Sequence, residues 1–431
     1  MPNADVCDYL VIGCCAAGVA GIEGIRKRDK EGSIVVVGEE DVAPYTRCLL
    51  TDYMVGEVDM RKLTYRPMRF FEINKVRPML GKKAVKLDAN AKQVTLASGE
   101  VLSYRKLLLA TGSSAVLYDV PGKELEGVHV LKCLRDAEGI LADAKKTKKA
   151  VVMGGGLVGI MTATALAEMG LDVCLAVTSP HIMSQNIDDD AAAILEEHLR
   201  EHKMRVLANA QVVEMIGKHR IEGVKLADGT VIECGVAVSA KGVRPNLALA
   251  EMAGIKGRRG ILVDDHMLTT SPDAYAAGDV VECKGFISGE LEVAHIWPVA
   301  VEQGHIAGEN MAGGDVAYAG VVGMNTTTFF GLPVVNIGES KNSTPEQGEQ
   351  FLVSSDTKAR RYKKVVLRDG KVVGAVLMGD VDNAGVYKSM ICTRVDVRAI
   401  REMLLAEEFD FGKLADALLT KQAIPPGQAG A

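Results

Sequence analysis

Aromatic side chains are scarce in this chain of 431 residues, making up 4% of it with a single tryptophan. The hydrophobic core must therefore rest on Val, Leu, Ile, Ala and Met, which supply most of the 48% apolar residues. The sequence also lacks a run of about 18 apolar residues that could span a bilayer. The first eight residues carry no basic region of a signal peptide. We therefore expect a cytoplasmic protein with no membrane span.

The chain has no excess of basic residues either, because its formal net charge is −6. Nucleic acid is therefore not expected as a partner, since neutralising phosphates needs clustered Lys and Arg. Nine cysteines without a secretory signal indicate reduced thiols rather than a disulfide framework. No two of them are spaced as C-x-x-C or C-x-x-x-x-C, which excludes the usual two-cysteine redox motifs. The length allows two or three domains.

The first nucleotide-binding pattern lies at residues 9–18, where an apolar run ends at Gly13 and an Ala-rich helical pattern begins. Gly13 and Gly18 occupy the first and third glycine positions of G-x-G-x-x-G, and Cys15 occupies the second. Such a strand-to-helix turn directs backbone N–H groups towards a pyrophosphate. Glu39 follows the next apolar run, residues 34–37, at the spacing of an acid that binds an adenosine ribose.

A second unit begins near Lys149, where the strand pattern 150–153 leads into the complete motif Gly154-Gly155-Gly156-Leu157-Val158-Gly159. A helix to Met169 and a strand at 173–177 are expected to follow. The position of the ribose acid holds Val177, and no Arg stands nearby to bind a 2′-phosphate. The second motif therefore predicts a dinucleotide site with little preference between NAD and NADP.

The rest of the chain alternates short strand and helix patterns. Turn residues separate apolar runs at 84–87, 93–96 and 101–109, which predicts a small antiparallel meander. Residues 43–50, which contain Arg47 and Cys48, are expected to form a loop. Further helices are predicted at 191–202, 297–311, 383–393 and 397–405, and strands within 205–240 and at 334–337, 364–367 and 372–378.

Two dinucleotide turns, with Thr111-Gly112 between them and Gly278-Asp279 after them, resemble the flavin-dependent pyridine nucleotide–disulfide oxidoreductase superfamily. The resemblance covers nearly the whole chain and implies an α/β fold with two Rossmann-like dinucleotide-binding domains. The NAD(P) domain, at 121–244, would be inserted into an FAD domain formed by 1–120 and 245–315. An α+β interface domain at 316–420 and a flexible tail at 421–431 would complete the chain.

The resemblance also assigns cofactor roles to particular residues. The first glycine turn would hold the FAD pyrophosphate, Glu39 the adenosine ribose and Ala84 the adenine, while Asp279 would accept a hydrogen bond from the ribityl chain. The second glycine turn would hold the pyrophosphate of NAD(P)H, and His181 would face its adenosine. The candidate cofactor-binding residues are Gly13, Cys14, Cys15, Ala16, Ala17, Gly18, Glu39, Arg47, Ala84, Ala110, Thr111, Gly112, Gly154, Gly156, Leu157, Val158, Gly159, Thr178, Ser179, His181, Gly242, Gly278, Asp279 and Pro298.

The segment around Arg47 points to two subfamilies. Pro44-Tyr45-Thr46-Arg47 resembles ferredoxin and rubredoxin reductases and the flavin part of nitrite reductase, in which the Arg lies on the flavin phosphates. Cys48 instead matches the single redox cysteine of NADH oxidases, coenzyme A disulfide reductases and persulfide reductases, and makes it the candidate catalytic residue. Asp52 stands where the first group has a Lys, and Ala16 where NADH oxidases have a His.

The resemblance implies an enzyme that passes electrons from NAD(P)H through FAD to an acceptor. A small redox protein or partner subunit is favoured by Arg47 and by residues 297–304. A thiol substrate, such as coenzyme A disulfide or a persulfide, is favoured by Cys48, whose thiolate the neighbouring Arg should stabilise. A nucleotide-binding redox sensor with little turnover is the third hypothesis. We expect a homodimer or a subunit of a redox complex, with no metal site. Cys14 and Cys15 are interpreted as small residues tolerated beside the phosphates.

Overall fold

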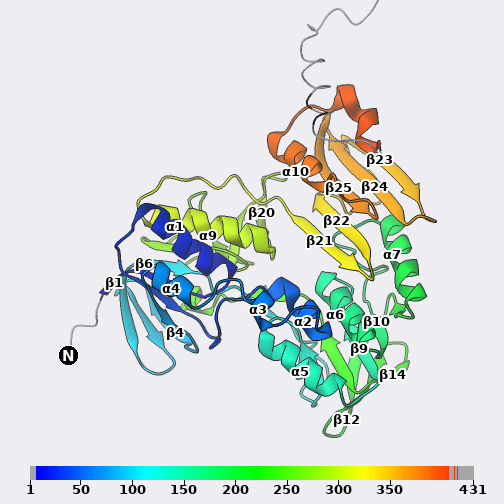
Figure 1. The fold of residues 1–431 in the computed structure, drawn as a ribbon, viewed down its shortest axis with the longest axis horizontal. Coiled ribbons are helices and arrows are strands. Elements are labelled where there is room, and N and C mark those ends of the chain that lie inside the picture. The colour runs from blue at the N-terminus through cyan, green and yellow to red at the C-terminus, as the bar shows by residue number, and fades with distance from the viewer. Residues whose placement is uncertain (1–5, 407–411, 413–414, 416–431) are drawn as a thin grey trace, which may run out of the picture. The chain divides into compact units, whose positions relative to one another are not determined.

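The computed structural model describes residues 6–406 together with 412 and 415 (Figure 1). These residues form two compact units. The first comprises residues up to 116 together with 130–141 and 242–321, and the second comprises 117–129, 142–241 and the residues from 322 onwards. In the described part of the chain, no helix is both long and apolar enough to cross a membrane. The expected tail at 421–431 lies outside the described residues.

The first unit is built on a seven-stranded sheet with the order β3-β2-β1-β6-β5-β4, to which β18 adds beside β6. Strands β1, β2, β3 and β18 run parallel to their neighbours, and β2 is buried along its whole length, as a strand covered on both faces is. The strands of this sheet are β1 (Val6–Ile12), β2 (Ile34–Val37), β3 (Val76–Met79), β4 (Ala84–Asp88), β5 (Gln93–Leu96), β6 (Val101–Leu109) and β18 (Ala274–Ala276).

Two long helices of this unit, α1 (Ala16–Arg28) and α9 (Trp297–Met311), pack side by side (Figure 1). Glycines permit the close approach: a Cβ on Gly304 would lie 2.3 Å from the Ala17 carbonyl oxygen. A Cβ on Gly308 would lie 2.1 Å from the Gly21 oxygen. The unit also contains α2 (Leu50–Val55), α3 (Met60–Leu63), α4 (Arg69–Ile73), α8 (Ala248–Met252), β7 (Ser113–Ala115), β16 (Val243–Pro245), β17 (Ile261–Leu262), β19 (Val281–Lys284) and β20 (Leu291–Val293).

The second unit contains a sheet with the order β11-β10-β9-β15-β8, in which β9, β10, β11 and β15 run parallel. Helix α6 (Leu157–Glu168) follows β9 through the second glycine turn and leads to β10. The remaining elements of this part are β8 (Val128–Val130), α5 (Leu134–Ala144), which begins in the first unit, β9 (Lys149–Met153), β10 (Asp172–Ala176), α7 (Asp189–Glu201), β11 (Arg205–Leu207), β12 (Val212–Gly217), β13 (Ile221–Leu226), β14 (Val231–Glu233) and β15 (Val236–Ser239).

The same unit includes a five-stranded antiparallel sheet with the order β21-β22-β25-β24-β23, against which α10 packs. Its elements are β21 (Met324–Phe329), β22 (Leu332–Gly338), β23 (Glu349–Asp356), β24 (Arg361–Arg368), β25 (Lys371–Met378), α10 (Ala384–Thr393) and the 3-10 helix Arg398–Leu405. Strands β21 and β23 were not predicted, because their side chains are mostly half-buried or exposed and show no clear apolar pattern.

Most predicted elements are confirmed, including the meander formed by β4, β5 and β6 and the helix Trp297–Met311. Two expectations were wrong in detail. The segment predicted as a loop at 43–50 contains a 3-10 turn over Arg47–Leu49 and leads directly into α2. The last predicted helix is of the 3-10 type, and its Val397 precedes the helix rather than beginning it.

Candidate functional site

The first glycine turn is held closed by its own backbone. Gly13 has φ +113, and a Cβ there would lie 2.0 Å from the Ala110 carbonyl oxygen. A Cβ on Gly18 would lie 1.9 Å from the Gly13 oxygen. Neither position can carry a side chain, so the predicted glycines are required by the geometry of the turn.

Helix α1 begins directly at this turn with uncapped backbone donors. Cys15 is the N-cap residue, but its side chain makes no capping hydrogen bond, and the first helical turn contains no acid. The N–H groups at the start of this 13-residue helix therefore remain available for an anion. Burial raises the pKa of the Cys14 thiol to about 12, so this cysteine is a neutral packing residue beside the turn.

Arg47 comes from the 3-10 turn, and two groups accept hydrogen bonds from its guanidinium. Its guanidinium lies 2.6 Å from Glu40 Oε2 and donates to the Lys132 carbonyl oxygen at 3.0 Å. Glu40 in turn accepts a hydrogen bond from the Tyr45 hydroxyl at 2.7 Å. Burial disfavours the charge, but Cys15, Tyr45 and Glu40 outweigh it and raise the pKa of Arg47. Its Nε is buried and has no hydrogen-bond partner in the structure. An unpaired buried donor of this kind fits an anionic group at this position.

Asp279 lies at the centre of a second polar cluster. It follows Gly278, whose φ is +84 and whose Cβ would lie 2.9 Å from the Ala17 Cβ. The carboxylate accepts hydrogen bonds from the Ser113 hydroxyl at 2.6 Å and from Lys132 Nζ at 2.9 Å. Desolvation opposes ionisation, but Lys132 and Ser113 outweigh it and lower the pKa of Asp279.

Sequence reasoning missed Lys132, which contributes to both clusters. Its carbonyl oxygen binds Arg47, while its ammonium group also donates to Ser113 Oγ at 2.9 Å. No motif marks residues 130–141, which fold with the first unit although they follow a segment of the second. His295 Nδ1 lies 3.8 Å from Asp279, and burial is the largest influence on the lowered pKa of this imidazole.

The predicted strand end at 110–112 is joined to a second missed residue, Asn246. The Asn246 side-chain amide donates to the Thr111 carbonyl oxygen at 2.8 Å, and the Thr111 hydroxyl donates to the backbone carbonyl oxygen of Asn246 at 3.1 Å. Gly112 has φ +64 with open space where a side chain would stand. The pairing of β7 with β16 brings these two segments together.

Glu39 and Ala84 are the residues predicted to bind the adenosine of FAD. Glu39 lies two residues beyond β2, is exposed and forms an ion pair with Lys83 at 2.9 Å. Ala84 is the first residue of β4 and follows Lys83 directly. Pro298 stands in the first turn of α9, and Gly242 accepts a backbone hydrogen bond from Val116.

The expected stabilisation of the Cys48 thiolate by Arg47 was wrong. Cys48 is exposed on one side, but protein atoms crowd the other, and this desolvation raises the pKa of its thiol. A hydrogen bond from Thr46 and the charge of Lys132 act in the opposite direction but do not outweigh burial, Cys15 and Asp279. Arg47 does not help, because Glu40 and the Lys132 carbonyl bind its guanidinium.

The second glycine turn repeats the geometry of the first. Gly154 has φ +127, and its Cβ would lie 2.3 Å from the Ala240 oxygen; a Cβ on Gly159 would lie 1.9 Å from the Gly154 oxygen. Gly156 differs, because nothing lies within 4 Å of where its Cβ would be. It is the N-cap of α6, which has no side-chain cap and no acid in its first turn. The empty space at an uncapped helix start fits a pyrophosphate.

The residues after β10 are fixed by local hydrogen bonds. Val177 is 1% exposed, and its side chain lies against Gly155. The Ser179 hydroxyl donates to the His181 carbonyl oxygen at 2.8 Å. The two ring nitrogens of His181 lie 2.7 Å from the Ile182 oxygen and 3.1 Å from Asp189 Oδ1. Both ring nitrogens of His181 therefore already have partners in neighbouring residues of the chain.

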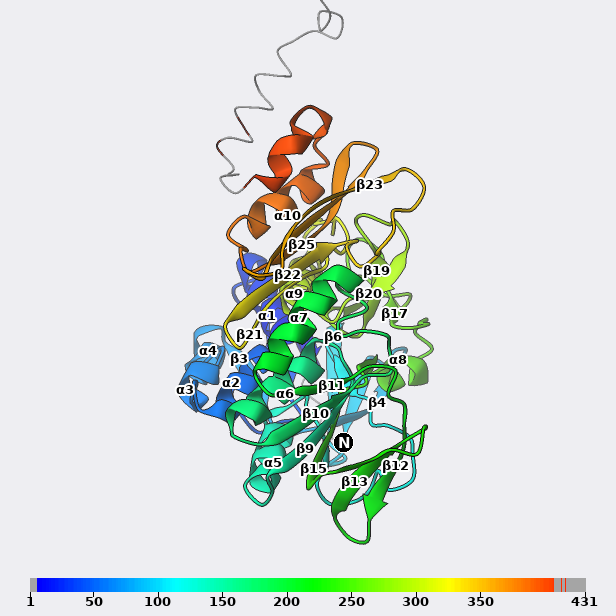
Figure 2. The ribbon, with the colours of Figure 1, turned by 90° about the vertical axis from the view of Figure 1, so that its right-hand side faces the viewer.

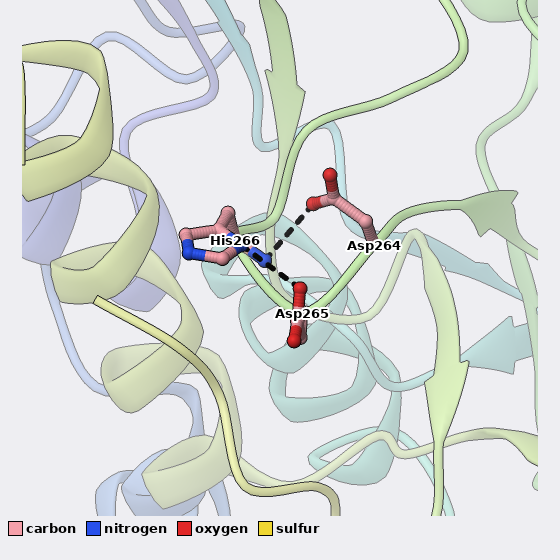
Figure 3. Close-up of side chains that lie close together, drawn as sticks. All are labelled: Asp264, Asp265 and His266. Carbon is pink, nitrogen blue, oxygen red and sulfur yellow. Dashed lines mark hydrogen bonds and ion pairs between the residues drawn. The ribbon is translucent and has the colours of Figure 1, made fainter. Parts of the chain in front are cut away.

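One group of possible metal ligands occurs among the described residues, formed by Asp264, Asp265 and His266 (Figure 3). Its ligand atoms lie within 4.8 Å of one another, but hydrogen bonds already occupy them. His266 contacts Asp265 at 2.8 Å and Asp315 at 2.9 Å, and Asp264 accepts backbone donors of the same loop. This exposed cluster shapes a turn.

Comparison with known proteins identifies the class of protein. Residues 7–304 match the family described as pyridine nucleotide-disulphide oxidoreductase, and residues 324–395 match the rubredoxin NAD+ reductase C-terminal domain. The chain belongs to the pyridine nucleotide–disulphide oxidoreductase family. It is therefore a flavin-dependent NAD(P)H oxidoreductase, and the fold class expected from the sequence is confirmed.

Among its relatives, subunit epsilon of the NADH-dependent phenylglyoxylate dehydrogenase of Aromatoleum evansii is 33% identical, over 94% of this chain and 96% of the relative. Nitrite reductase [NAD(P)H] of Bacillus subtilis is also 33% identical over 90% of this chain, which spans only 47% of that longer enzyme. A solved structure of an NAD-dependent persulfide reductase from A. fulgidus superposes with a TM-score of 0.85 at 25% identity, over 96% of this chain and 84% of that one.

Proposed function

We propose that this protein transfers electrons from NAD(P)H through FAD to an iron–sulfur or rubredoxin-type protein, or to a partner subunit of that kind. The overall reaction consumes one NAD(P)H and two oxidised one-electron acceptors and yields NAD(P)⁺, a proton and two reduced acceptors. Bound FAD would supply the chemistry that links a two-electron hydride donor to one-electron acceptors. The observation that carries the proposal is the paired cluster of Arg47 and Asp279, joined by Lys132.

In this proposal the residues of the first unit bind and orient FAD. The N–H groups at the start of α1 and the free Nε of Arg47 would donate to the pyrophosphate. The pyrophosphate would thus supply the hydrogen-bond acceptor that the buried Nε otherwise lacks. Asp279, which Ser113 and Lys132 hold in place, would accept a hydrogen bond from a ribityl hydroxyl of FAD. Glu39 binds the adenosine ribose. The proposed domains remain those expected from the sequence, with 1–120 and 245–315 for FAD, 121–244 for NAD(P)H and 316–420 as an interface domain, except that residues 130–141 join the FAD unit.

The second glycine turn, with the space beside Gly156, binds the pyrophosphate of NAD(P)H. The buried Val177 offers no carboxylate to the ribose, so we propose that the enzyme accepts both NADH and NADPH. A homodimer or membership of a redox complex, and a cytoplasmic location, remain predictions from the sequence. The relationship to a dehydrogenase subunit supports membership of a complex.

The acceptor class is supported by two comparisons. The C-terminal residues match a rubredoxin reductase domain, and the relative matched over nearly its whole length is a subunit of a larger dehydrogenase. The raised pKa of Cys48 disfavours the thiolate that a disulfide or persulfide reductase needs at neutral pH. The likeness to a persulfide reductase keeps the thiol acceptor as the second candidate.

Anaerobic stopped-flow reduction by NADH and by NADPH tests the proposal, followed by rubredoxin, ferredoxin and coenzyme A disulfide as acceptors. We expect rapid bleaching of the flavin by either nucleotide and reoxidation by the protein acceptors. Reoxidation by coenzyme A disulfide alone would favour the thiol mechanism. Bleaching too slow to support turnover would indicate the redox sensor.

A further inference from the structure

The residues just before α7 are joined to the second glycine turn through backbone hydrogen bonds. The Met183 N–H donates to the Gly155 carbonyl oxygen at 2.7 Å. The Met183 carbonyl oxygen in turn accepts from the N–H groups of Asn186 and Ile187, at 2.7 and 3.0 Å. We call residues 183–188 the pre-α7 segment. Because one of its donors is bonded to the turn that is proposed to hold the nucleotide pyrophosphate, the conformation of this segment affects that turn.

The pre-α7 segment also lies against the antiparallel sheet of the same unit. Figure 2 shows α7 beside that sheet, as does Figure 1. The hydroxyl of Ser340, a residue that is 2% exposed, donates to the Asn186 carbonyl oxygen at 3.1 Å. The Ser343 hydroxyl oxygen accepts from the Asp189 N–H at 3.2 Å. Residues 339–343, which follow β22, therefore bind the end of the segment and the start of α7.

A buried ion pair anchors the last residue of the segment. Lys364 comes from β24, and its Nζ lies 2.7 Å from Asp188 Oδ2, with side chains that are 1% and 4% exposed. The Tyr362 hydroxyl donates to the same carboxylate oxygen at 2.9 Å. The other oxygen caps α7 by accepting the Ala191 N–H at 3.0 Å. The Lys364 ammonium also donates to the Ser340 carbonyl oxygen at 3.3 Å, so one cation holds both sides of the contact.

Stability alone is a weak reason for such a pair. Taking two charges out of water offsets much of their attraction, and an apolar pair of similar volume is often as stable. What the pair adds is a fixed arrangement of the groups that it joins. Lys363, the preceding residue of β24, has other partners: its Nζ lies 3.9 Å from Asp380 and 3.5 Å from the Ala406 carbonyl oxygen. The two neighbouring lysines therefore offer a matched comparison.

We propose that Lys364 is a positioning residue for NAD(P)H: through Asp188 it holds the pre-α7 segment in the conformation that receives the adenosine half of the nucleotide. The inference rests on the proposed function, which places the nucleotide at the second glycine turn, and it adds that β24 controls the affinity of that site. Without the ion pair, the segment populates other conformations. The apparent Kd then rises in inverse proportion to the fraction of molecules that stay competent to bind.

The test compares two double variants of the whole chain, each of which removes one ion pair of β24. The first is Lys364→Met with Asp188→Asn, in which Asn still caps α7 and no charge is left buried without a partner. The control is Lys363→Met with Asp380→Asn, which removes the neighbouring pair. Ser340→Ala is a milder variant that removes the hydrogen bond to the pre-α7 segment and keeps both charges.

Affinity is measured with and without turnover. Anaerobic stopped-flow reduction gives the Kd of NADH and the limiting rate of flavin reduction, and calorimetry with 1,4,5,6-tetrahydro-NAD, which cannot donate a hydride, gives binding alone. In the first variant both dissociation constants should rise about 10-fold, with the limiting rate and the flavin content unchanged. Ser340→Ala should show a smaller rise, and the control variant none. Reduced nicotinamide mononucleotide, which lacks the adenosine half, should reduce all variants as fast as the wild type.

Amide hydrogen exchange provides a readout that does not depend on the nucleotide. At a temperature well below unfolding, the Met183 and Ile187 amides should exchange faster in the first variant than in the wild type or the control. Their hydrogen bonds, to Gly155 and within the segment, open when the segment is released.

Three outcomes would contradict the positioning role or the proposal beneath it. A folded first variant with wild-type Kd for NADH would overturn the role of Lys364 and leave the proposed function intact. Equal losses of affinity in the first variant and the control, or an equal loss with the mononucleotide, would show that β24 supports the fold as a whole instead. A wild-type enzyme whose flavin is reduced by neither NADH nor NADPH would overturn the proposed function itself.

Discussion

The two glycine turns share their first and last glycines but carry different residues between them. Gly13 and Gly154 both have positive φ, and a Cβ on either would strike a carbonyl oxygen of a neighbouring strand end. At the helix N-cap the first turn has Cys15, with φ −122, where the second has Gly156, with φ −82 and open space around it.

The surroundings of the two turns differ more than the turns themselves. Around the first, distant segments bring together Arg47, Lys132 and Asp279, with Ser113 and Glu40 fixing them. Around the second, the residues after β10 are held mainly by hydrogen bonds within their own loop, and Val177 is buried. Each turn therefore offers a general anion site, and we infer that the remote side chains set how tightly and selectively a cofactor is held.

The largest effect is expected from Asp279→Ala. The variant removes the acceptor for a ribityl hydroxyl and leaves Lys132 and Ser113 without their partner, which costs about 1–3 kcal/mol of binding free energy. Purified wild-type protein should be yellow with about one FAD per chain, and the variant should lose most of its flavin on dialysis. The absorbance ratio of flavin to protein measures this loss.

Asp273→Ala serves as the control, because Asp273 forms a salt bridge with Lys92 on the surface of the same unit. Its flavin content should match that of the wild type. An apoprotein whose unfolding temperature does not rise when FAD is added would contradict the assignment of the whole cluster.

Gly156→Ala tests the second turn. Since φ is −82 and nothing stands within 4 Å, the fold should tolerate the methyl group, with stability unchanged or raised by about 0.4–1 kcal/mol. The methyl group would occupy the space for the pyrophosphate and raise the Kd of NADH about 10-fold, or about 1.4 kcal/mol. Titration calorimetry and thermal unfolding measure the two effects separately.

Gly154→Ala is the matched structural control, since its positive φ and the close Ala240 oxygen should lower stability by more than about 1 kcal/mol. Cys15→Ala, at the position equivalent to Gly156, should leave flavin binding nearly unchanged. Unaltered NADH affinity in Gly156→Ala would show that the pyrophosphate lies elsewhere.

A smaller change is expected from Val177→Glu, which supplies the missing carboxylate at the ribose position. The ratio of kcat/KM for NADH over NADPH should rise, because a 2′-phosphate is repelled and a 2′-hydroxyl gains an acceptor. Val177→Gln has nearly the same shape without the charge, so it measures the steric part of the change. A hundredfold preference of the unmutated enzyme for NADH would show that another residue recognises the ribose.

The smallest effect is expected from Cys48→Ser, which should leave the reduction of a protein acceptor nearly unchanged. Because the pKa of Cys48 is raised above its ordinary value, less thiolate is present at neutral pH, and the fraction rises only as the pH approaches the raised pKa. Iodoacetamide should therefore react with Cys48 more slowly at pH 7 than with the exposed Cys392. A charge-transfer band on two-electron reduction, lost in Cys48→Ser, would instead support the thiol mechanism.

The sequence by itself determined both glycine turns, the helices that follow them and the Gly278–Asp279 pair. These features are local: a turn that must adopt positive φ requires glycine, and the 3.6-residue and alternating patterns mark the adjoining elements. The missing acid at Val177 could be read directly for the same reason, because its position is counted from the turn.

Only the tertiary structure revealed the roles of Lys132 and Asn246 and the state of Cys48. Lys132 lies 147 residues from Asp279 in the chain, and Asn246 lies 135 residues from Thr111, so no local pattern connects them. The sequence places Arg47 next to Cys48 and suggests a stabilised thiolate. In the folded chain Glu40 and the Lys132 carbonyl bind that guanidinium, and burial raises the pKa of the thiol. Burial and charge pairing depend on which distant segments meet, and only the fold determines that.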